Sequence, residues 1–216
     1  MKIVVISDTH NRHRQLIIPE GDVLIHAGDI SNWGVSKHII DFNAWLATLP
    51  HQYKLVISGN HDTCLQGKRT PSSITWARKL LSNANYLQDE EITIDGIKFY
   101  GTPWTPWYGD WAFTLKKESD RSLKWNKIPK NTDVLITHGP PYSFRDNCSP
   151  PENSKERHVG CNALRKTIER IKPRLNVFGH VHIGYGISHN KHTKFINASV
   201  CSHEFDTVKK PFIIEI

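Results

Sequence analysis

The sequence has no apolar run near the roughly 20 residues that a bilayer-spanning helix needs, so no membrane-spanning segment is expected. The first apolar stretch, residues 3–6, meets Asp8 too soon for a secretory signal, which needs a longer apolar region and a small-residue cleavage site. Such a stretch is typical of a first β-strand. We therefore expect a cytoplasmic protein with no membrane partner.

Cysteine is scarce, and its spacing carries no metal-binding or disulfide signature. The four cysteines are far apart and form no CxxC pair. A zinc ribbon or a disulfide framework is therefore not expected, and free thiols are favoured. The cysteines are Cys64, Cys148, Cys161 and Cys201.

Repeats, low-complexity tracts and long linkers are also lacking. Hydrophobic residues make up 38% and charged residues 23% of the 216 residues, a composition typical of a globular protein. This length suits one sizeable core rather than two. We predict a single domain over residues 1–216.

The net charge of +7 would favour an anionic partner, but the basic residues are not concentrated enough to identify one. The densest basic stretch, residues 116–130, is interrupted by Glu118 and Asp120. A solvated helix face explains it as well as a nucleic-acid track does. A nucleic-acid partner is therefore possible but not favoured, and the oligomeric state cannot be read from the sequence.

Short β-type runs alternate with helix-type patterns, which predicts an α/β layered fold. Ser36 is a candidate N-cap for the first helix and Pro50 a candidate stop. The Asp95-Gly96 pair predicts a two-residue hairpin turn, so the sheets should be mixed. The β-type runs are 2–7, 23–27, 54–58, 91–94, 98–101, 134–137, 175–178, 194–197 and 211–215, and the helix-type patterns are 36–48, 72–82 and 161–171.

Polar groups follow five of the β-type runs directly, where ligand sites collect in α/β folds. Carboxylate, amide oxygen and imidazole together suit divalent ions such as Mn²⁺, Fe²⁺ or Zn²⁺. A site for two metals needs a bridging carboxylate, and Asp29 is the best candidate. Glycines beside these groups would let the backbone approach the ions closely. The groups are Asp8-Thr9-His10, Gly28-Asp29, Gly59-Asn60-His61-Asp62, His138-Gly139 and Gly179-His180-Val181-His182.

In this order the motifs resemble the calcineurin-like metallophosphoesterase family, whose pattern is DxH, GD, GNH[DE], H and GHxH. Four further segments resemble its metallophosphoesterase-domain (MPPED-like, UPF0046-type) subgroup, so the resemblance covers nearly the whole chain. Ile183 departs from it, since many relatives have Glu there, and this affects substrate contacts rather than metal binding. The four segments are 101–104, 137–141, 158–161 and 178–186.

The resemblance implies a four-layer β-sandwich of mixed sheets flanked by helices. It also implies two divalent ions, with Mn²⁺ favoured and Fe, Zn, Ni or Mg possible. His61 would protonate or stabilise the leaving oxygen, with Asp62 orienting its ring. Asp8, His10 and His182 would hold one metal, Asn60, His138 and His180 the other, and Asp29 would bridge them.

We expect a phosphodiesterase that hydrolyses cyclic or other small nucleotide phosphodiesters by attack of a metal-bridging hydroxide. The same centre would serve a phosphomonoesterase or a nuclease, and these remain alternatives. A non-catalytic scaffold of this fold is disfavoured, because all seven ligand positions and His61 are intact.

An aromatic segment, residues 103–111, holds four aromatic residues stiffened by two prolines. These rings would either cover the core or offer a stacking wall to a base, with Trp104 the best candidate for stacking. His158 would line the pocket or serve the structure. We interpret the other histidines as ordinary side chains, and these are His13, His26, His38, His51, His189, His192 and His203.

Overall fold

A computed structural model describes residues 1–66, 74–149, 157–202 and 208–216. Its first sheet has the strand order β13-β1-β2-β3-β4, in which β1 to β4 run parallel and β13 is antiparallel to β1. The strands are β1 (Lys2–Ile6), β2 (Val23–Ala27), β3 (Tyr53–Ile57), β4 (Asn85–Tyr86) and β13 (Phe212–Glu215).

The second sheet has the order β11-β12-β10-β9-β6-β5, and its four central strands are parallel. Both edge strands are antiparallel to their neighbours, so the two sheets are mixed, as predicted. The strands are β5 (Glu90–Ile94), β6 (Ile97–Thr102), β9 (Val134–Thr137), β10 (Leu175–Phe178), β11 (Gly186–His189) and β12 (Lys194–Asn197), and a separate pair is formed by β7 (Thr105–Pro106) and β8 (Thr114–Leu115).

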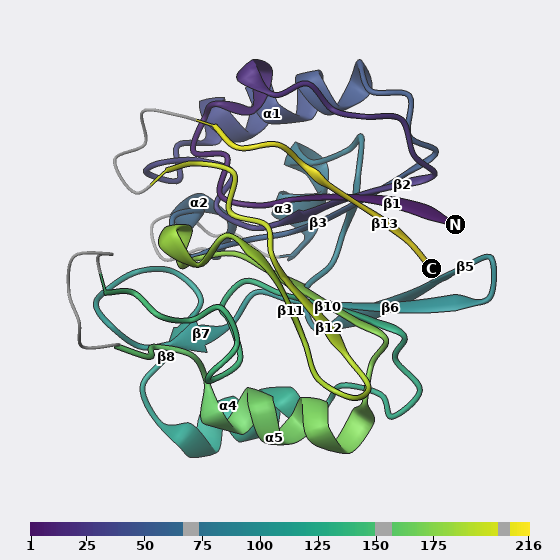
Figure 1. Ribbon diagram of the computed structural model, residues 1–216. Helices are drawn as coiled ribbons and strands as arrows, with labels where there is room; N and C mark the ends of the chain where they lie inside the picture. The colour runs from purple at the N-terminus through teal and green to yellow at the C-terminus, as the bar shows by residue number, and fades with distance from the viewer. Residues whose placement is uncertain (67–73, 150–156, 203–207) are drawn as a thin grey trace.

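Helices cover the outer faces of both sheets, so the molecule has the four layers that were predicted (Figure 1). On the first sheet lie α1 (Ser36–Ala47), α2 (Thr63–Gln66) and α3 (Ile74–Leu80), and on the second lie α4 (Glu118–Trp125) and α5 (Asn162–Ile171). Two single turns, η1 (His13–Gln15) and η2 (His182–Gly184), complete the helical elements.

The apolar faces of the two sheets pack directly on each other. Ile3, Val5 and Ile25 of the first sheet share one buried cluster with Val134 and Val177 of the second. The opposite faces of the same strands are buried under the helices, which explains why these strands read as continuous apolar runs. Side chains can therefore reach solvent mainly at the strand ends, and the functional residues must lie there.

The predicted hairpin is present, because β5 and β6 pair as far as Ile94 and Ile97. Asp95 and Gly96 both have positive φ, 49° and 79°, as a type I′ turn requires. All four cysteines carry free thiols, as expected. Among the described residues, no helix has both the length and the apolar character needed to cross a membrane.

The helix boundaries differ from the sequence expectation in detail. The predicted N-cap at Ser36 is wrong: α1 begins at Ser36, and its N-cap is Val35, which makes no side-chain cap. The start of the predicted helix at 72–82 lies outside the described residues, and α3 covers 74–80. Part of the basic stretch forms α4, which is consistent with a helix face. Cys161 caps α5 by accepting the Leu164 N–H through its sulfur.

Candidate metal centre

The ends of five parallel strands bring the predicted ligands together. Asp8 follows β1, Asp29 follows β2 and Asn60 follows β3, all in the first sheet. His138 follows β9 and His180 follows β10 in the second sheet. The two sheets are joined here, since the His180 N–H donates to both oxygens of Asp8 at 3.0 Å.

Four of the ligand residues have left-handed backbone conformations. The φ angle is 54° at Asp8, 43° at His10, 56° at Asp29 and 70° at His180. Such conformations cost on the order of 1–2 kcal/mol per residue, although Asp and His tolerate them better than most side chains. Strain of this kind concentrates at functional sites, because the surrounding structure must impose it.

Glycine is needed beside the ligands for close approach. A Cβ on Gly179 would lie 1.9 Å from Asp8 Oδ2, and a Cβ on Gly59 would lie 2.2 Å from Asp29 Oδ1. Neither glycine has positive φ, so glycine is not needed for the backbone conformation. It is needed because any side chain at these positions would clash with the carboxylates of Asp8 and Asp29.

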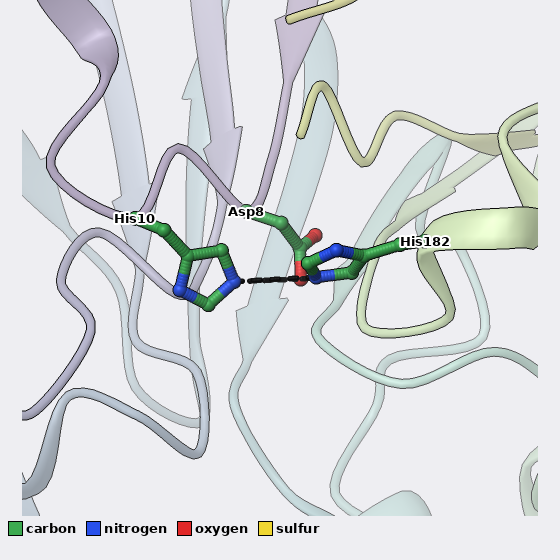
Figure 2. Close-up of side chains that lie close together, drawn as sticks. All are labelled: Asp8, His10 and His182. Carbon is green, nitrogen blue, oxygen red and sulfur yellow. Dashed lines mark hydrogen bonds and ion pairs between the residues drawn. The ribbon is translucent and has the colours of Figure 1, made fainter. Parts of the chain in front are cut away.

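Asp8, His10 and His182 form the first ligand group, and their side chains point toward one another in Figure 2. His182 Nε2 lies 3.4 Å from Asp8 Oδ1 and 3.2 Å from His10 Nε2. Metal–ligand bonds of about 2.1 Å place neighbouring ligand atoms roughly 3 Å apart. The spacing of this group therefore suits one metal ion.

Asn60, His138 and His180 form the second group. The amide oxygen of Asn60 lies 2.9 Å from His138 Nε2 and 2.9 Å from His180 Nδ1. Asn60 and His138 are fully buried, whereas His180 is partly exposed.

Asp29 stands between the two groups. Its Oδ2 atom lies 3.4 Å from His138 Nε2 and 3.8 Å from His10 Nε2, so one oxygen faces both groups. Its Oδ1 atom accepts the His61 backbone N–H at 2.8 Å, which fixes the orientation of the carboxylate. This is the geometry that a bridging ligand requires, and it supports the role expected for Asp29.

Hydrogen bonds to backbone carbonyls fix how two of the imidazoles present their nitrogens. His138 Nδ1 donates to the Ala27 carbonyl at 2.9 Å, and His182 Nδ1 donates to the Ser202 carbonyl at 2.9 Å. In the neutral rings the Nε2 lone pairs must then face the site. Ligating histidines in metal sites are held in this way.

Lone pairs converge most closely at His138. Its Nε2 faces two acceptor oxygens, one on Asn60 and one on Asp29, so a cation must lie among the three atoms. A metal ion satisfies all three at once, and a proton is the only alternative. The donor set of imidazole nitrogens with carboxylate and amide oxygens therefore fits the divalent ions expected from the sequence.

In the metal-free protein, the neighbouring carboxylates and burial together determine the pKa values of the ligand histidines. Burial opposes a charge on His138, but the Asp29 carboxylate outweighs it and raises the pKa of His138 to about 9. Burial lowers the pKa of His10 to about 4 and that of His180 to about 3. Burial also disfavours ionised Asp8, yet the hydrogen bond from His182 holds its pKa well below the usual range.

His61 lies beside the first group, and with His10 and Asp29 it forms a third set of side chains close enough to hold an ion. Its ring stands 4.8 Å from that of His10, edge to face. Its Nδ1 donates to the Asn32 carbonyl at 2.6 Å, so the ring can take up and release a proton only at Nε2. The partly exposed position of His61 fits a residue that meets the substrate.

Asp62 does not orient the His61 ring, contrary to the expectation from the sequence. Its fully buried carboxylate accepts the backbone N–H groups of Ile30, Ser31 and Gly59 at 2.9–3.2 Å. It also accepts the Ser31 hydroxyl at 3.1 Å. Asp62 therefore joins the loop that carries Asp29 to the loop that carries Asn60, while the Asn32 carbonyl holds the His61 ring.

Trp104 is not placed at the centre. Its indole N–H donates to Asp89 at 3.0 Å, its ring packs edge to face on Phe113, and the Lys124 ammonium lies 4.0 Å from the ring centroid. These contacts make Trp104 part of the structural core, because its polar and apolar faces are both engaged. The prediction of Trp104 as a stacking residue is therefore wrong.

His158 and the buried histidines have structural contacts. His158 Nδ1 lies 2.7 Å from Asp146 Oδ1, and the His158 ring packs against Tyr142. His26 is buried and bonded to Thr9, and His13 is buried and bonded to Asp41, as expected of ordinary histidines. His203 lies outside the described residues.

Three aromatic residues that the sequence reasoning did not single out lie beside the ligands. The Trp111 ring is 4.2 Å from that of His61, Trp33 stacks on Trp111 at 6.0 Å, and Tyr108 is 5.2 Å from His180. Two of these three residues, Trp111 and Tyr108, belong to the aromatic segment 103–111. Trp33 follows Asp29 closely in the chain, and this proximity was the available signal.

Comparison with known proteins agrees with the centre. The sequence profile of the calcineurin-like phosphoesterase family matches residues 1–184. Metallophosphoesterase domain-containing protein 1 of Homo sapiens is 40% identical over this entire chain and 71% of its own length. UPF0046 protein K07C11.7 of Caenorhabditis elegans is 37% identical over the entire chain and 75% of its own length.

A solved structure shares the fold at low sequence identity. The crystal structure of phosphopantetheinyl hydrolase (PptH) from Mycobacterium tuberculosis has a TM-score of 0.62 at 15% identity. The match covers 94% of this chain and 90% of that one, so the similarity extends over all layers of the fold.

Replacing Asp29 by Asn should abolish binding of a metal pair, because an amide lacks the charge that holds two cations on one oxygen. We expect the metal content after gel filtration, measured by mass spectrometry of the metals, to fall from two ions per chain to one or none. Asp120→Asn, at an exposed position of α4, is the matched control. Two ions retained by Asp29→Asn would contradict the bridging role.

Metal uptake near pH 7 should release protons, because the pKa of about 9 keeps His138 protonated in the metal-free protein. The raised pKa also stabilises the metal-free fold below about pH 6.5, and this contribution is lost as the pH rises through about 9. Calorimetric titration in two buffers of different protonation enthalpy measures the release. Equal heats in both buffers near pH 7 would argue against it, and the release from His138 should vanish near pH 10.

Proposed function

The chain belongs to the calcineurin-like phosphoesterase family of metal-dependent phosphoesterases, and from this we propose that it is a phosphodiesterase. Its substrates are cyclic or other small nucleotide phosphodiesters, and its cofactors are two divalent ions, with Mn²⁺ favoured. The observation that carries the proposal is the position of aromatic rings at two places in the centre, beside His61 and beside His180. An open phosphodiester has two organic groups on phosphorus, and each can contact one of these aromatic residues. A cyclic nucleotide has a single organic group joined to phosphorus through two oxygens, and its base can contact either one.

The residues that hold the metals divide into the two groups already described, with Asp29 shared between them. Divalent ions held by these residues would supply a hydroxide nucleophile near neutral pH and would neutralise charge on the phosphoryl oxygens. Asp8, Asn60 and His138 are fully buried, so the chain keeps them in fixed positions and excludes water from behind the site. Ligands held in this way need little reorganisation during the reaction.

His61 supplies the proton for the leaving oxygen. The Asn32 carbonyl holds its Nδ1–H, so the protonated ring donates from Nε2, the nitrogen free to meet the substrate. The His61 backbone N–H bonds to Asp29, so the same residue also fixes the bridging carboxylate. The acid and the metal centre are therefore positioned by one short segment of chain.

A phosphomonoesterase or a nuclease would use the same residues. The charge pattern gives a nuclease little support, because Lys124 of the basic stretch pairs with Asp89 at 2.7 Å and Arg121 donates to the carbonyls of Leu115 and Lys116. These contacts use basic side chains within the fold. Small phosphodiesters remain the preferred substrates.

The substrate class is tested with bis-p-nitrophenyl phosphate beside p-nitrophenyl phosphate, using metal-stripped protein resupplied with Mn²⁺. We expect strong Mn²⁺-dependent hydrolysis of the diester and little of the monoester, because the second organic group adds contacts to an aromatic wall. The reverse preference would make the protein a monoesterase. Absence of both activities in protein carrying two metals would contradict the proposal.

Replacing His61 by Ala should lower kcat for the diester by roughly 10²–10⁴-fold, the usual contribution of a general acid. The metal content should remain at the wild-type level, which separates this variant from Asp29→Asn. The matched control is His192→Ala, whose side chain is exposed. A His61→Ala enzyme with wild-type kcat would exclude His61 as the acid.

A further inference from the structure

Two tryptophans from distant parts of the chain form a stacked pair beside the proposed acid. Trp33 and Trp111 lie 6.0 Å apart between ring centroids, with their planes inclined by 22°. Trp111 lies 4.2 Å from the His61 ring, and Trp33 lies 6.4 Å from it. The pair therefore adjoins His61, the proposed acid, and Trp111 is the nearer of the two rings.

The loops that carry the pair are tied to the centre. Asn32, directly before Trp33, accepts the hydrogen bond from the His61 ring through its carbonyl, and the Trp33 carbonyl accepts from Thr63. On the other loop, the N–H of Ala112, directly after Trp111, donates to the carbonyl of Asn60 at 3.1 Å. The position of each tryptophan is thus fixed by a residue of the catalytic segment 60–63.

Trp33 is 68% exposed, although its loop is held firmly by these bonds. Single exposed apolar side chains are common, but contiguous apolar surface marks binding sites, and Trp33 is joined to Trp111 beside His61. Because this surface adjoins His61, an occupant would also lie at the reacting group. This position favours the substrate over a protein partner.

Tyr108 lies beside the second ligand group. It lies on the same loop as Trp111, and its ring is 5.2 Å from that of His180 in the second ligand group. The Trp33–Trp111 pair therefore lies beside His61, whereas Tyr108 lies beside His180.

We propose that Trp33 and Trp111 form a platform that stacks the base of a nucleoside leaving group, and so determine specificity for base-bearing phosphodiesters. This inference rests on the proposed phosphodiesterase function. Stacking on aromatic side chains accepts every base, because each has a flat π-face. The platform therefore selects for the presence of a base rather than for its identity.

The test compares adenosine 2′,3′-cyclic phosphate with ribose 2′,3′-cyclic phosphate, which has the same reacting group and no base. The metal-loaded protein should show a kcat/KM roughly 5- to 150-fold higher for the adenosine compound, the range that stacking on an aromatic side chain provides. Because both substrates are measured on one preparation, the ratio cancels differences in folding or metal content.

Trp33→Ala should bring this ratio close to one, and Trp33→Phe should restore most of it. The matched control is Trp107→Ala, another exposed tryptophan, whose ring lies under Lys116 rather than beside His61. Its ratio should equal that of the wild type. A wild-type ratio near one, or a ratio unchanged in Trp33→Ala, would overturn the inference.

Equilibrium binding separates the platform from the chemistry. Adenosine 3′-phosphate should bind the metal-loaded protein more tightly than ribose 3-phosphate, by a margin that Trp33→Ala removes. If the protein shows this difference in affinity but does not hydrolyse bis-p-nitrophenyl phosphate, the inference about the platform stands and the proposed phosphodiesterase function is rejected. If the protein hydrolyses that diester but shows no difference in affinity, the phosphodiesterase function stands and the inference about the platform is rejected.

Discussion

Electron pairs on nitrogen and oxygen converge at one end of this fold, and only a positive charge can hold them together. At His138 the Nδ1–H is committed to the Ala27 carbonyl, while Nε2 faces oxygens of Asn60 and Asp29. In the metal-free protein the positive charge is a proton on His138, which the Asp29 carboxylate stabilises. The pKa of His138 therefore rises to about 9 despite complete burial. A metal ion would accept the lone pairs of several ligand atoms at once. The arrangement of the surrounding loops follows from keeping these atoms within reach of one another.

The two sheets place the ligands, but buried polar contacts hold the loops in register. Asp8 accepts the backbone N–H of His180 from the other sheet and the hydroxyl of Ser199, so its carboxylate links segments distant in sequence. Asp62 performs the corresponding task between the loops that carry Asp29 and Asn60. Burial and the nearby Asp29 charge raise the pKa of Asp62 to about 6, so its interaction with three backbone amides is formed against an electrostatic cost. These contacts impose the left-handed conformations that the ligand residues adopt.

The sequence was informative where the signal was local. An apolar run followed directly by Asp, His or Asn predicts both a buried strand and a polar group at its end, and all seven expected ligand residues lie together in the structure. The four-layer arrangement came from the resemblance, since local patterns do not determine how two sheets pack. Trp104 was misjudged because its contacts with Asp89 and Lys124 depend on chain segments that meet only in the fold. The role of Asp62 was misjudged for the same reason, because adjacency to His61 in sequence does not direct its side chain toward that ring.

The backbone segments that position the proposed acid also position the aromatic residues proposed to bind the base. Asn32 holds the proposed acid through its carbonyl, and the next residue, Trp33, presents the exposed face of the stacking pair. Asn60 offers its side-chain oxygen to two histidines, and its backbone carbonyl anchors the loop that carries Trp111. Closer contact between a flat group and the tryptophans would therefore act on the same segments that position His61 and the second ligand group. Binding energy gained away from phosphorus can in this way contribute to orientation at the reacting atoms. This sharing explains why the aromatic residues lie on loops bonded to the ligand residues rather than on independent elements.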